Sequence, residues 1–313
     1  MCLSTIIVTG VAGFIGSRTA ERLLADGHKV IGIDNLSTGK MENIPDSVEF
    51  HKIDIGEYNQ LQEINFSGVD AVMHFASQSS GELSYNDPKY DLVTNAIGTF
   101  NLIRQSVEHG VKRFIYTSTV GVYGVFQERP TKESDEQMPI SYYGISKLAG
   151  EHYVRSFMEQ IDVTIFRLTN TYGAGQDLDN LNQGMVSIYL AYMLNNETIH
   201  IKGSPERFRD FIAVDDVINI YCEALENKIC IGNTYNLSTG RKTTVNELLQ
   251  LLRAAWGDMD YPAKFEGTTQ GDIFGIYLDN TKLLSDFSHT PSIPLEEGLK
   301  EFVSWAKEKK GIV

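Results

Sequence analysis

The sequence predicts an α/β protein built on a doubly wound parallel sheet, with a smaller C-terminal domain interleaved with it. Short apolar runs alternate with amphipathic helical segments through the first half of the chain, and the first run ends in three glycines spaced three apart. Such alternation is typical of a parallel sheet covered by helices on both faces. A long polar loop, residues 175–184, then interrupts the alternation. We therefore expect a sheet domain in residues 1–170, to which the chain returns near 208–238, and a smaller domain in 171–313.

The first apolar run, Ile6–Val8, consists of β-branched residues that suit a strand buried on both faces. Gly10 permits the tight turn after it, and Gly13 has no Cβ to keep a phosphate away. Gly16 lets the next helix lie close to the strand. This helix is expected over residues 14–26, and the free N–H groups at its start favour an anion. The pattern predicts a dinucleotide site.

A carboxylate follows the second apolar run, residues 29–33. Asp34 lies 18 residues after Gly16, where a dinucleotide fold places the acid that accepts hydrogen bonds from the adenosine ribose. A carboxylate would repel a 2′-phosphate, so NAD is favoured over NADP. The third run, residues 48–53, leads to Asp54 and Ile55. This pair could meet the adenine ring, or it could be a strand end with an exposed acid.

The other expected elements follow from apolar spacing and capping residues. In the sheet domain they are a strand at 71–75 followed by small residues, a helix at 90–108 with Leu92 and Leu102 among its repeating positions, a strand at 113–117, a helix at 143–160 with Ile145 and Tyr153 among its apolar positions, and a strand at 163–168. Later elements are helices at 185–194, 214–225 and 295–309, a strand at 199–201, and a helix to Ala255 opened by the capping box Thr244–Glu247.

A tyrosine and a lysine four residues apart begin the expected helix at 143–160. Tyr143 and Lys147 therefore project from one helix face. A tyrosine with a pKa of about 10 is a poor base at neutral pH, but a nearby cation stabilises its phenolate. Lys147 is one such cation, and an oxidised nicotinamide is another. The hydroxyl cluster Thr117–Thr119, at the end of the fifth strand, could hydrogen-bond the same substrate oxygen.

Composition narrows the class of protein. The chain carries 27 basic and 41 acidic residues, a net charge of −14, which argues against general affinity for nucleic acid or an anionic membrane. Three cysteines, Cys2, Cys222 and Cys230, fit reduced thiols in the cytoplasm better than a disulfide framework. No basic residue precedes Arg18 and no apolar run approaches membrane-spanning length, so we expect neither a signal peptide nor a membrane segment. The scattered histidines predict no metal site.

The motifs that carry a family resemblance run through most of the chain: Gly10-x-x-Gly13-x-x-Gly16, Asp34-Asn35-Leu36, Asp54-Ile55, His74-Phe75-Ala76, Asn95, Ser118-Thr119-x-x-Val122-Tyr123-Gly124, Pro139-x-Ser141-x-Tyr143-Gly144-x-Ser146-Lys147, Arg167 with Asn170-x-Tyr172-Gly173, and Arg209-Asp210-Phe211. Together they resemble the extended short-chain dehydrogenase/reductase family. Within it the resemblance is to NAD-dependent nucleotide-sugar epimerases and dehydratases, and it is closest to the UDP-glucose 4-epimerases. It implies a Rossmann sheet that binds NAD and a C-terminal domain that binds the substrate.

The resemblance also implies roles for individual residues. Tyr143 would be the base, Lys147 would hold the nicotinamide ribose and lower the pKa of Tyr143, and Thr119 would be their hydroxyl partner, with Ser118 as the second candidate. The expected cofactor-binding residues are Gly10, Gly13, Phe14, Ile15, Gly16, Asp34, Asn35, Asp54, Ile55, Phe75, Ala76, Ser77, Asn95, Thr117, Tyr143 and Lys147. The expected substrate-binding residues are Ser79, Thr119, Tyr143, Asn170, Gln183, Gly184, Met185, Lys202, Arg209 and Asp272.

Two positions distinguish the reactions of the family. Dehydratases carry Asp-Glu directly after the catalytic threonine, and decarboxylases carry a glutamate in the second of these places, whereas this chain has Val120-Gly121. Neither residue can move a proton, so we expect 4-epimerisation of a UDP-hexose: oxidation at C4, rotation of the keto sugar and re-reduction on its other face. The alternatives are a 4,6-dehydratase or 4-ketoreductase and, from another class, a non-catalytic NAD-sensing protein.

Some positions depart from the family pattern. The late Arg-x-Gly-Asp motif is Thr269-Gln-Gly-Asp272, so its arginine is missing; Arg207 could replace it or be a solvated surface residue. Lys202 stands where many relatives stack an aromatic on uracil, so UDP is expected only from its frequency in the family. Ile276 lies near the position that gates N-acetylated substrates in relatives, and Ser79 lies where some relatives have a lysine on the sugar. Neither residue identifies the sugar. The resemblance further predicts a homodimer formed through the helices at 90–108 and 143–160.

Overall fold

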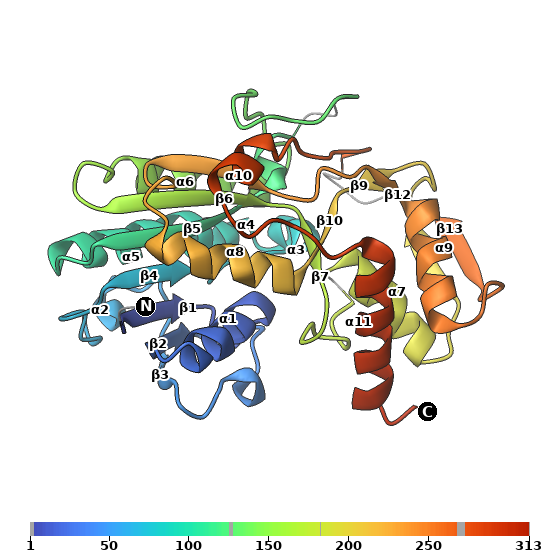
Figure 1. The fold of residues 1–313 in the computed structure, drawn as a ribbon, viewed down its shortest axis with the longest axis horizontal. Coiled ribbons are helices and arrows are strands. Elements are labelled where there is room, and N and C mark those ends of the chain that lie inside the picture. The colour runs from blue at the N-terminus through green and yellow to red at the C-terminus, as the bar shows by residue number, and fades with distance from the viewer. Residues whose placement is uncertain (1–2, 125–127, 182, 268–272, 313) are drawn as a thin grey trace.

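The computed structural model describes residues 3–124, 128–181, 183–267 and 273–312, and its centre is a seven-stranded sheet (Figure 1). All its neighbouring strands are parallel, in the order β3 (Glu49–Lys52), β2 (Lys29–Asp34), β1 (Thr5–Thr9), β4 (Ala71–His74), β5 (Arg113–Thr119), β6 (Asp162–Leu168) and β11 (Asn233–Leu237). The predicted doubly wound sheet is confirmed. The strand order reverses between β1 and β4, which is where such sheets bind ligands.

Side chains of each central strand alternate between two cores. Ile6 and Val8 of β1 pack in one core with α1 (Phe14–Ala25) and α8 (Val214–Glu226), on one face of the sheet. Ile7 packs in the other core with α5 (Gly98–Glu108) and α6 (Tyr142–Arg155). Figure 1 shows these two helix layers on opposite sides of the sheet. Because both faces are covered, an apolar strand is favoured at the centre of the sheet, which explains the β-branched run of β1.

The helix expected at 90–108 contains a π-helical turn. It consists of α4 (Pro88–Leu92), the π turn η2 (Val93–Ile97) and α5, with helical backbone angles at the junctions. The extra residue of a π turn changes which side chains face inward. Leu92 is therefore 50% exposed and Ile97 43%, whereas Asn95 is fully buried. The expectation that Leu92 shares the inward face of Leu102 was wrong for this reason.

The helix α6 also buries polar side chains. α6 buries Gly144, Lys147 and Glu151, while the apolar residues Ile145 and Tyr153 are 49% and 44% exposed. α6 ends at Arg155, and hydrogen-bonded turns, not α-helix, lead on to Gln160. Of the apolar positions expected on the inner face, Ile145 and Tyr153 are therefore wrong, whereas Leu148, Phe157 and Met158 are partly buried against the cores.

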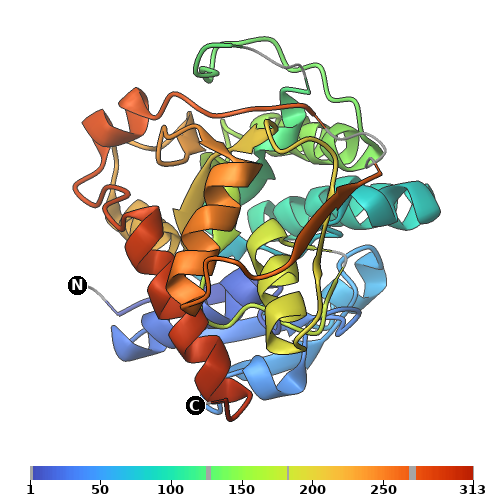
Figure 2. The ribbon, with the colours of Figure 1, turned by 90° about the vertical axis from the view of Figure 1, so that its right-hand side faces the viewer.

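A third core, separate from the two that cover the sheet, lies beyond the carboxyl ends of the sheet strands. It is formed by α7 (Met185–Leu194), α9 (Val245–Trp256), α11 (Leu295–Lys309) and the parallel pair β8 (Ile199–Lys202) and β13 (Ala263–Glu266). Figure 2 shows the three helices side by side. All three were expected. Thr244 caps α9 as predicted, because its hydroxyl accepts a 3.0 Å hydrogen bond from the backbone N–H of Glu247.

The chain crosses between the main sheet and the third core more than once. Two small sheets lie between them: β7 (Asn170–Tyr172) pairs with β10 (Phe211–Ala213), and β9 (Phe208–Arg209) pairs with β12 (Thr243–Thr244). After β10 the chain returns to the main sheet with α8 and β11. A further return, α10 (Thr281–Asp286), places Leu283 in the core of Ile6 and was not expected.

Four short helical turns each follow the carboxyl end of a sheet strand. They are η1 (Met41–Asn43) after β2, α2 (Tyr58–Leu61) after β3, α3 (Gly81–Asn86) after β4 and η3 (Val120–Val122) after β5. They gather the polar loops at one edge of the sheet. Among the described residues, no helix combines the length and apolarity needed to cross a membrane.

Candidate active site

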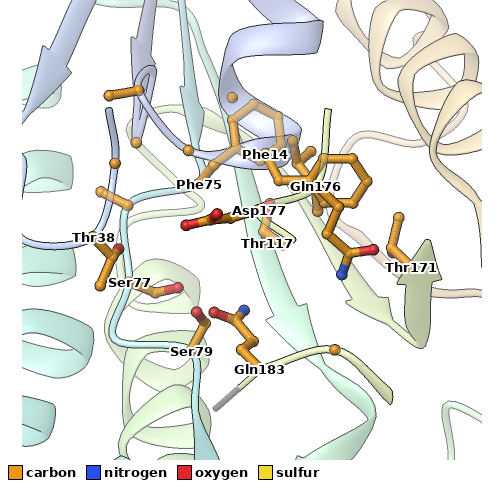
Figure 3. A pocket seen from close by; sticks show the side chains of 18 of the residues that line it. Phe14, Thr38, Phe75, Ser77, Ser79, Thr117, Thr171, Gln176, Asp177 and Gln183 are labelled. Carbon is orange, nitrogen blue, oxygen red and sulfur yellow. The ribbon is translucent and has the colours of Figure 1, made fainter. Parts of the chain in front are cut away.

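A cleft of about 410 Å³ lies along the carboxyl edge of the sheet, facing the third core. Its walls come from the glycine loop, the ends of β2, β4, β5 and β7, and the segments around residues 175–177 and 183–186. Figure 3 shows Ser77, Ser79 and Gln183 pointing into the same space, with Phe14 and Phe75 near the glycine loop. The cleft brings together residues that are far apart in the sequence.

The three glycines of the first loop have separate roles. Gly10 has φ +72°, and a Cβ there would lie 2.8 Å from the backbone nitrogen of Ala76. A Cβ at Gly16 would collide with the carbonyl oxygen of Gly10. Gly13 is the N-cap of α1 and has no side chain to occupy the first N–H groups. These groups face the cleft, which fits the pyrophosphate of a dinucleotide.

Gly16→Ala is expected to lower the free energy of unfolding by about 3 kcal/mol, because the added methyl group must push two backbone segments apart. It should also reduce the amount of NAD that copurifies with the protein. Thermal unfolding and the cofactor released on denaturation measure the two effects. Gly81→Ala is the matched control, since a Cβ at Gly81 meets nothing within 4 Å; equal losses in both variants would contradict the close packing assigned to Gly16.

Asp34 lines the cleft at the end of β2. Its two carboxylate oxygens accept hydrogen bonds from the backbone N–H groups of Ala12, at 3.0 Å, and Leu36, at 2.8 Å. Burial raises the pKa of Asp34, and these two bonds oppose the rise. Ile55 also lines the cleft, whereas the carboxylate of Asp54 accepts from the side chain of Asn35 at 3.0 Å.

The loop after β4 is held in place by Asn95. Phe75, Ala76 and Ser77 line the cleft, but Asn95 is fully buried behind them. The Asn95 amide accepts from the backbone N–H of Gln78 and donates to its carbonyl oxygen, both at 2.9 Å. The structure therefore gives Asn95 a positioning role, and its predicted contact with the cofactor remains a prediction.

Tyr143 faces the cleft from the first turn of α6 and is hydrogen-bonded to Thr119 at the end of β5. The helix begins here because the Ser141 hydroxyl accepts from the backbone N–H of Gly144 at 3.1 Å. Burial raises the pKa of Tyr143 to about 12, although the hydrogen bond from Thr119 acts in the opposite direction. In this structure, then, Tyr143 is a protonated phenol at neutral pH.

Lys147 lies one helical turn further on and is only 2% exposed. Its ammonium is 4.5 Å from the centroid of the Tyr116 ring. Burial lowers the pKa of Lys147 to about 7, whereas the charges of Glu151 and Asp91 act to raise it. The expected lowering of the Tyr143 pKa by Lys147 is not present here, because burial works against both charged forms.

The structure favours Thr119 over Ser118 as the hydroxyl partner of Tyr143. The Ser118 hydroxyl is buried and donates a 2.5 Å hydrogen bond to Glu151. Thr119 instead accepts from the backbone N–H of Gly121 at 3.1 Å, and its proton is available to the phenol. Thr117, also in the cleft, shares a 2.7 Å hydrogen bond with the hydroxyl of Tyr221.

Only some of the residues expected to bind the substrate line the cleft in the structure. Those that line the cleft are Ser79, Thr119, Tyr143, Asn170, Gln183, Gly184 and Met185. Lys202 instead forms a 3.0 Å ion pair with Glu82 of α3. Arg209 is buried and donates to the carbonyl oxygen of Ile273 at 2.8 Å. Arg207 is also buried, so the alternative that it is a solvated surface residue was wrong. Asp272 lies outside the described residues.

Comparison with known proteins identifies the family of the chain. The model of the NAD dependent epimerase/dehydratase family matches residues 6–238. The chain belongs to this family. It is 35% identical over 305 residues to a putative UDP-glucose 4-epimerase of Methanocaldococcus jannaschii, covering 96% of this chain and 98% of the relative.

Solved structures of the epimerase/dehydratase family resemble the whole chain. The UDP-glucose 4-epimerase of Thermotoga maritima with UDP-glucose has a TM-score of 0.92 and 36% identity, covering 97% of this chain and 99% of that one. The UDP-glucose 4-epimerase of Thermus thermophilus in complex with NAD has a TM-score of 0.88 and 30% identity, covering 96% and 98% of the two chains. The family and the NAD cofactor expected from the sequence are thus confirmed, and the glycine loop and Asp34 fit that cofactor.

Sequence interpretation missed the first part of the segment after Gly173, although Gln183, Gly184 and Met185 further along it were expected to bind the substrate. Gln176 and Asp177 line the cleft, and Asp177 forms a 3.0 Å ion pair with Lys40, which also lines it. Opposite charges 137 residues apart leave no local signal. Other lining residues that were missed include Ala12, Ser37, Thr38, Gly39, Asn43, Tyr90, Thr94, Val120, Thr169, Thr171, Asn180, Val186 and Phe211.

Proposed function

We propose that the protein is an NAD-dependent 4-epimerase of a nucleotide sugar, and that this sugar is a UDP-hexose. The observation that carries the proposal is the hydrogen-bonded pair Tyr143–Thr119 at the wall of the cleft, followed by Val120 and Gly121. The phenol and hydroxyl can move a proton at one sugar oxygen. The two residues after them have no group that could remove water from C5 and C6.

The acids of the cleft support epimerisation over dehydration. Among the described residues that line the cleft, the carboxylates are Asp34 and Asp177. Asp34 is engaged with two backbone N–H groups beside the glycine loop, and Asp177 is paired with Lys40. An elimination needs its own acid and base beside the sugar, in addition to the oxidising pair. Neither carboxylate is placed next to Tyr143 for this work.

The chemistry of the chain's own side chains is proton transfer at the C4 hydroxyl. Oxidation requires the phenolate of Tyr143, which the positive charge of an oxidised nicotinamide in the cleft would favour against the effect of burial. The phenolate takes the proton as the carbon is oxidised, and the phenol returns it after the keto sugar has turned over. Thr119 orients the oxygen through its hydrogen bond to Tyr143. Lys147 supplies a positive charge on the same helix face. When bound, NAD accepts the C4 hydride and gives it back, so it ends each turnover oxidised.

Two rival functions have less support. A single-pass 4-ketoreductase needs a cofactor that leaves after each reaction, usually NADPH, and Asp34 disfavours its extra phosphate. A non-catalytic NAD sensor would have no need for Tyr143, Lys147 and Thr119 together. We further propose that residues 1–170 with the later returns bind NAD, and that the remainder binds the substrate.

A panel of UDP-, CDP-, dTDP- and GDP-sugars, incubated without added cofactor, tests the proposal. Mass spectrometry and proton NMR of the products distinguish the outcomes. Unchanged mass with inversion at C4, fastest with a UDP-hexose, is the expected result. Loss of one water would establish a dehydratase, and a product formed only with added NADPH would establish a reductase.

We also propose a homodimer formed through a helix patch of four half-exposed apolar residues, Leu92, Ile97, Ile145 and Tyr153. They project from α4, η2 and α6, which pack on one another. Ile97→Asp is expected to convert the dimer to a monomer, because burying a carboxylate in an apolar interface is costly. Light scattering after size exclusion measures the mass. Ile229→Asp, at a 63% exposed site outside the patch, should leave it unchanged; a monomeric wild type would overturn this proposal.

We place the protein in the cytoplasm. Cys222 and Cys230 are both free thiols, which suits a reducing compartment. Fractionation of the source cells, followed by detection of the native protein, tests this assignment. Recovery in the soluble cytoplasmic fraction is expected.

A further inference from the structure

A short segment without regular structure lies beside the glycine loop at the wall of the cleft. Residues 174–179, which we call the strap, follow β7 and form no helix or strand. Gly175 and Asp177 of the strap line the cleft, as do Gly13 and Phe14 at the start of α1. A Cβ at Gly175 would lie 3.6 Å from the Phe14 ring, so the strap packs against this start. The strap therefore borders the N–H groups that fit a pyrophosphate.

The beginning of the strap is tethered to the sheet domain by Arg18 of α1. The Arg18 guanidinium donates a 3.1 Å hydrogen bond to the carbonyl oxygen of Ala174 and forms a 2.7 Å ion pair with Asp215 of α8. On either side of Ala174, Gly173 has φ +140° and Gly175 has φ +96°. Glycine changes its backbone angles at little cost, so the strap can swing about this tethered end.

The outer part of the strap is attached to the third core. Leu178 is 7% exposed and packs in that core. Asp179 forms a 2.9 Å ion pair with Lys310, which directly follows α11 of the same core. Leu178 and Lys310 therefore fix the outer part of the strap to the third core and not to the sheet domain.

Lys40, in the loop after β2, joins the strap to the glycine loop. Its ammonium lies 3.0 Å from a carboxylate oxygen of Asp177 and 3.7 Å from one of Asp179. Its backbone N–H donates to the carbonyl oxygen of Ala12, within the glycine loop, at 3.1 Å. Figure 3 shows Asp177 directed toward the loop that carries Thr38. We call Lys40 and the two acids the clasp.

The clasp is strong enough to affect a rate without blocking it. The side chains of Lys40 and Asp177 are 40% and 34% exposed, and a single exposed ion pair contributes little. Here, however, one ammonium meets two carboxylates, and Asp179 is already held by Lys310. Less side-chain freedom is therefore lost when the clasp forms. The strap cannot move away from the glycine loop unless both contacts of Lys40 break.

We propose that the clasp holds the strap closed beside the dinucleotide site, and that its opening controls how fast NAD enters and leaves. Lys40, Asp177 and Asp179 act on one another, so the clasp resists opening in both directions. The proposal rests on the NAD cofactor and not on epimerisation. It assigns these residues a positioning role, outside the proton transfer at Tyr143.

Lys40→Gln removes both contacts of the clasp and keeps a side chain of similar length. Release and entry of the dinucleotide should both become about fivefold faster, because they cross the same opened state. Protein loaded with NADH and mixed with excess NAD gives the release rate by fluorescence. Protein freed of NAD and mixed with NADH gives the entry rate. Faster release with unchanged entry would show that Lys40 holds the dinucleotide directly, and would overturn the proposal.

Asp177→Asn tests the same alternative from the other side, because it keeps the charge of Lys40. Release should become about twofold faster, since the contact with Asp179 remains. A lysine that bound a phosphate would instead be set free by this change, and release would become slower. Lys40→Glu combined with Asp177→Lys reverses the pair and should return release to within about twofold of the wild type. Release as fast as in Lys40→Gln would contradict the clasp.

The control is another exposed lysine of the same strand and loop region. Lys29, at the start of β2, forms a 2.8 Å ion pair with Glu49 and does not line the cleft. Lys29→Gln should leave both rates unchanged, and equal acceleration in Lys29→Gln and Lys40→Gln would overturn the proposal.

Opening of the strap can also be followed without any sugar. In Lys40→Gln, amide hydrogen exchange in the peptide 174–179 should be faster than in the wild type, with the strands of the sheet unchanged. Wild-type release should also accelerate as salt rises to 1 M, where charges are screened beyond about 3 Å, and more so than in Lys40→Gln. Both results are expected even if the protein epimerises no sugar. Unchanged exchange in the strap would contradict the clasp.

Discussion

Tyr143→Phe is expected to lower the rate of epimerisation about a thousandfold while the protein keeps its NAD. The variant removes one oxygen from a buried site and leaves the ring, so packing is preserved. What is lost is the group that exchanges a proton with the C4 hydroxyl, held in place by Thr119. Product formation by NMR gives the rate, and the NAD released on denaturation gives the cofactor content.

The control for this variant is its neighbour. Tyr142→Phe also removes a phenol oxygen from the first turn of α6, but Tyr142 is 46% exposed and does not line the cleft. It should keep nearly full activity. Loss of NAD from Tyr143→Phe would indicate a structural defect, and turnover within tenfold of the wild type would remove Tyr143 from its proposed role.

Arg167→Ala is expected to lower the free energy of unfolding by about 3–5 kcal/mol, because it leaves the buried carboxylate of Glu151 with only the more distant and more exposed Arg155 as a cation. The two side chains are 2% and 1% exposed and lie 2.8 Å apart. Arg167 also donates to the hydroxyl of Tyr123 at 3.0 Å, so its loss affects the segment that carries η3. Urea or thermal unfolding measures the change.

The exposed pair Arg104–Glu108 provides the matched control. Its atoms are 2.7 Å apart, but both side chains are more than 40% exposed. Arg104→Ala should therefore cost far less than Arg167→Ala, because solvent screens an exposed pair. A similar small cost for Arg167→Ala would show that Glu151 becomes protonated or solvated without penalty, and would contradict the buried pair as a source of stability.

The same pair predicts how stability depends on pH. Burial alone would raise the pKa of Glu151, but the hydrogen bonds and charge of Arg167 hold it below its ordinary value of 4.5. A carboxyl whose folded pKa is depressed contributes stability above its unfolded pKa and loses it as the pH falls through the folded pKa. The wild type should therefore lose this contribution below pH 4.5, whereas Arg167→Ala should lose less, because only Ser118 and Arg155 then act to lower the pKa of Glu151.

The sequence by itself determined the elements whose signals are local. The glycine spacing after β1, the β-branched run of β1 and the apolar period of α8 and α11 each lie within one short segment, and the structure confirmed them. The spacing of Tyr143 and Lys147 likewise placed both on one helix face. Local geometry depends on residues a few positions apart, so a single segment is enough to specify it.

Only the tertiary structure decided which of these residues meet and how they are charged. It chose Thr119 over Ser118 because Glu151, 33 residues away, takes the Ser118 proton. It revealed the π turn at Asn95 and the Lys40–Asp177 pair. It also reversed the expected shift in the pKa of Tyr143, because burial outweighs the nearby ammonium. Burial and through-space charge depend on everything packed around a group, and no run of neighbouring residues encodes them.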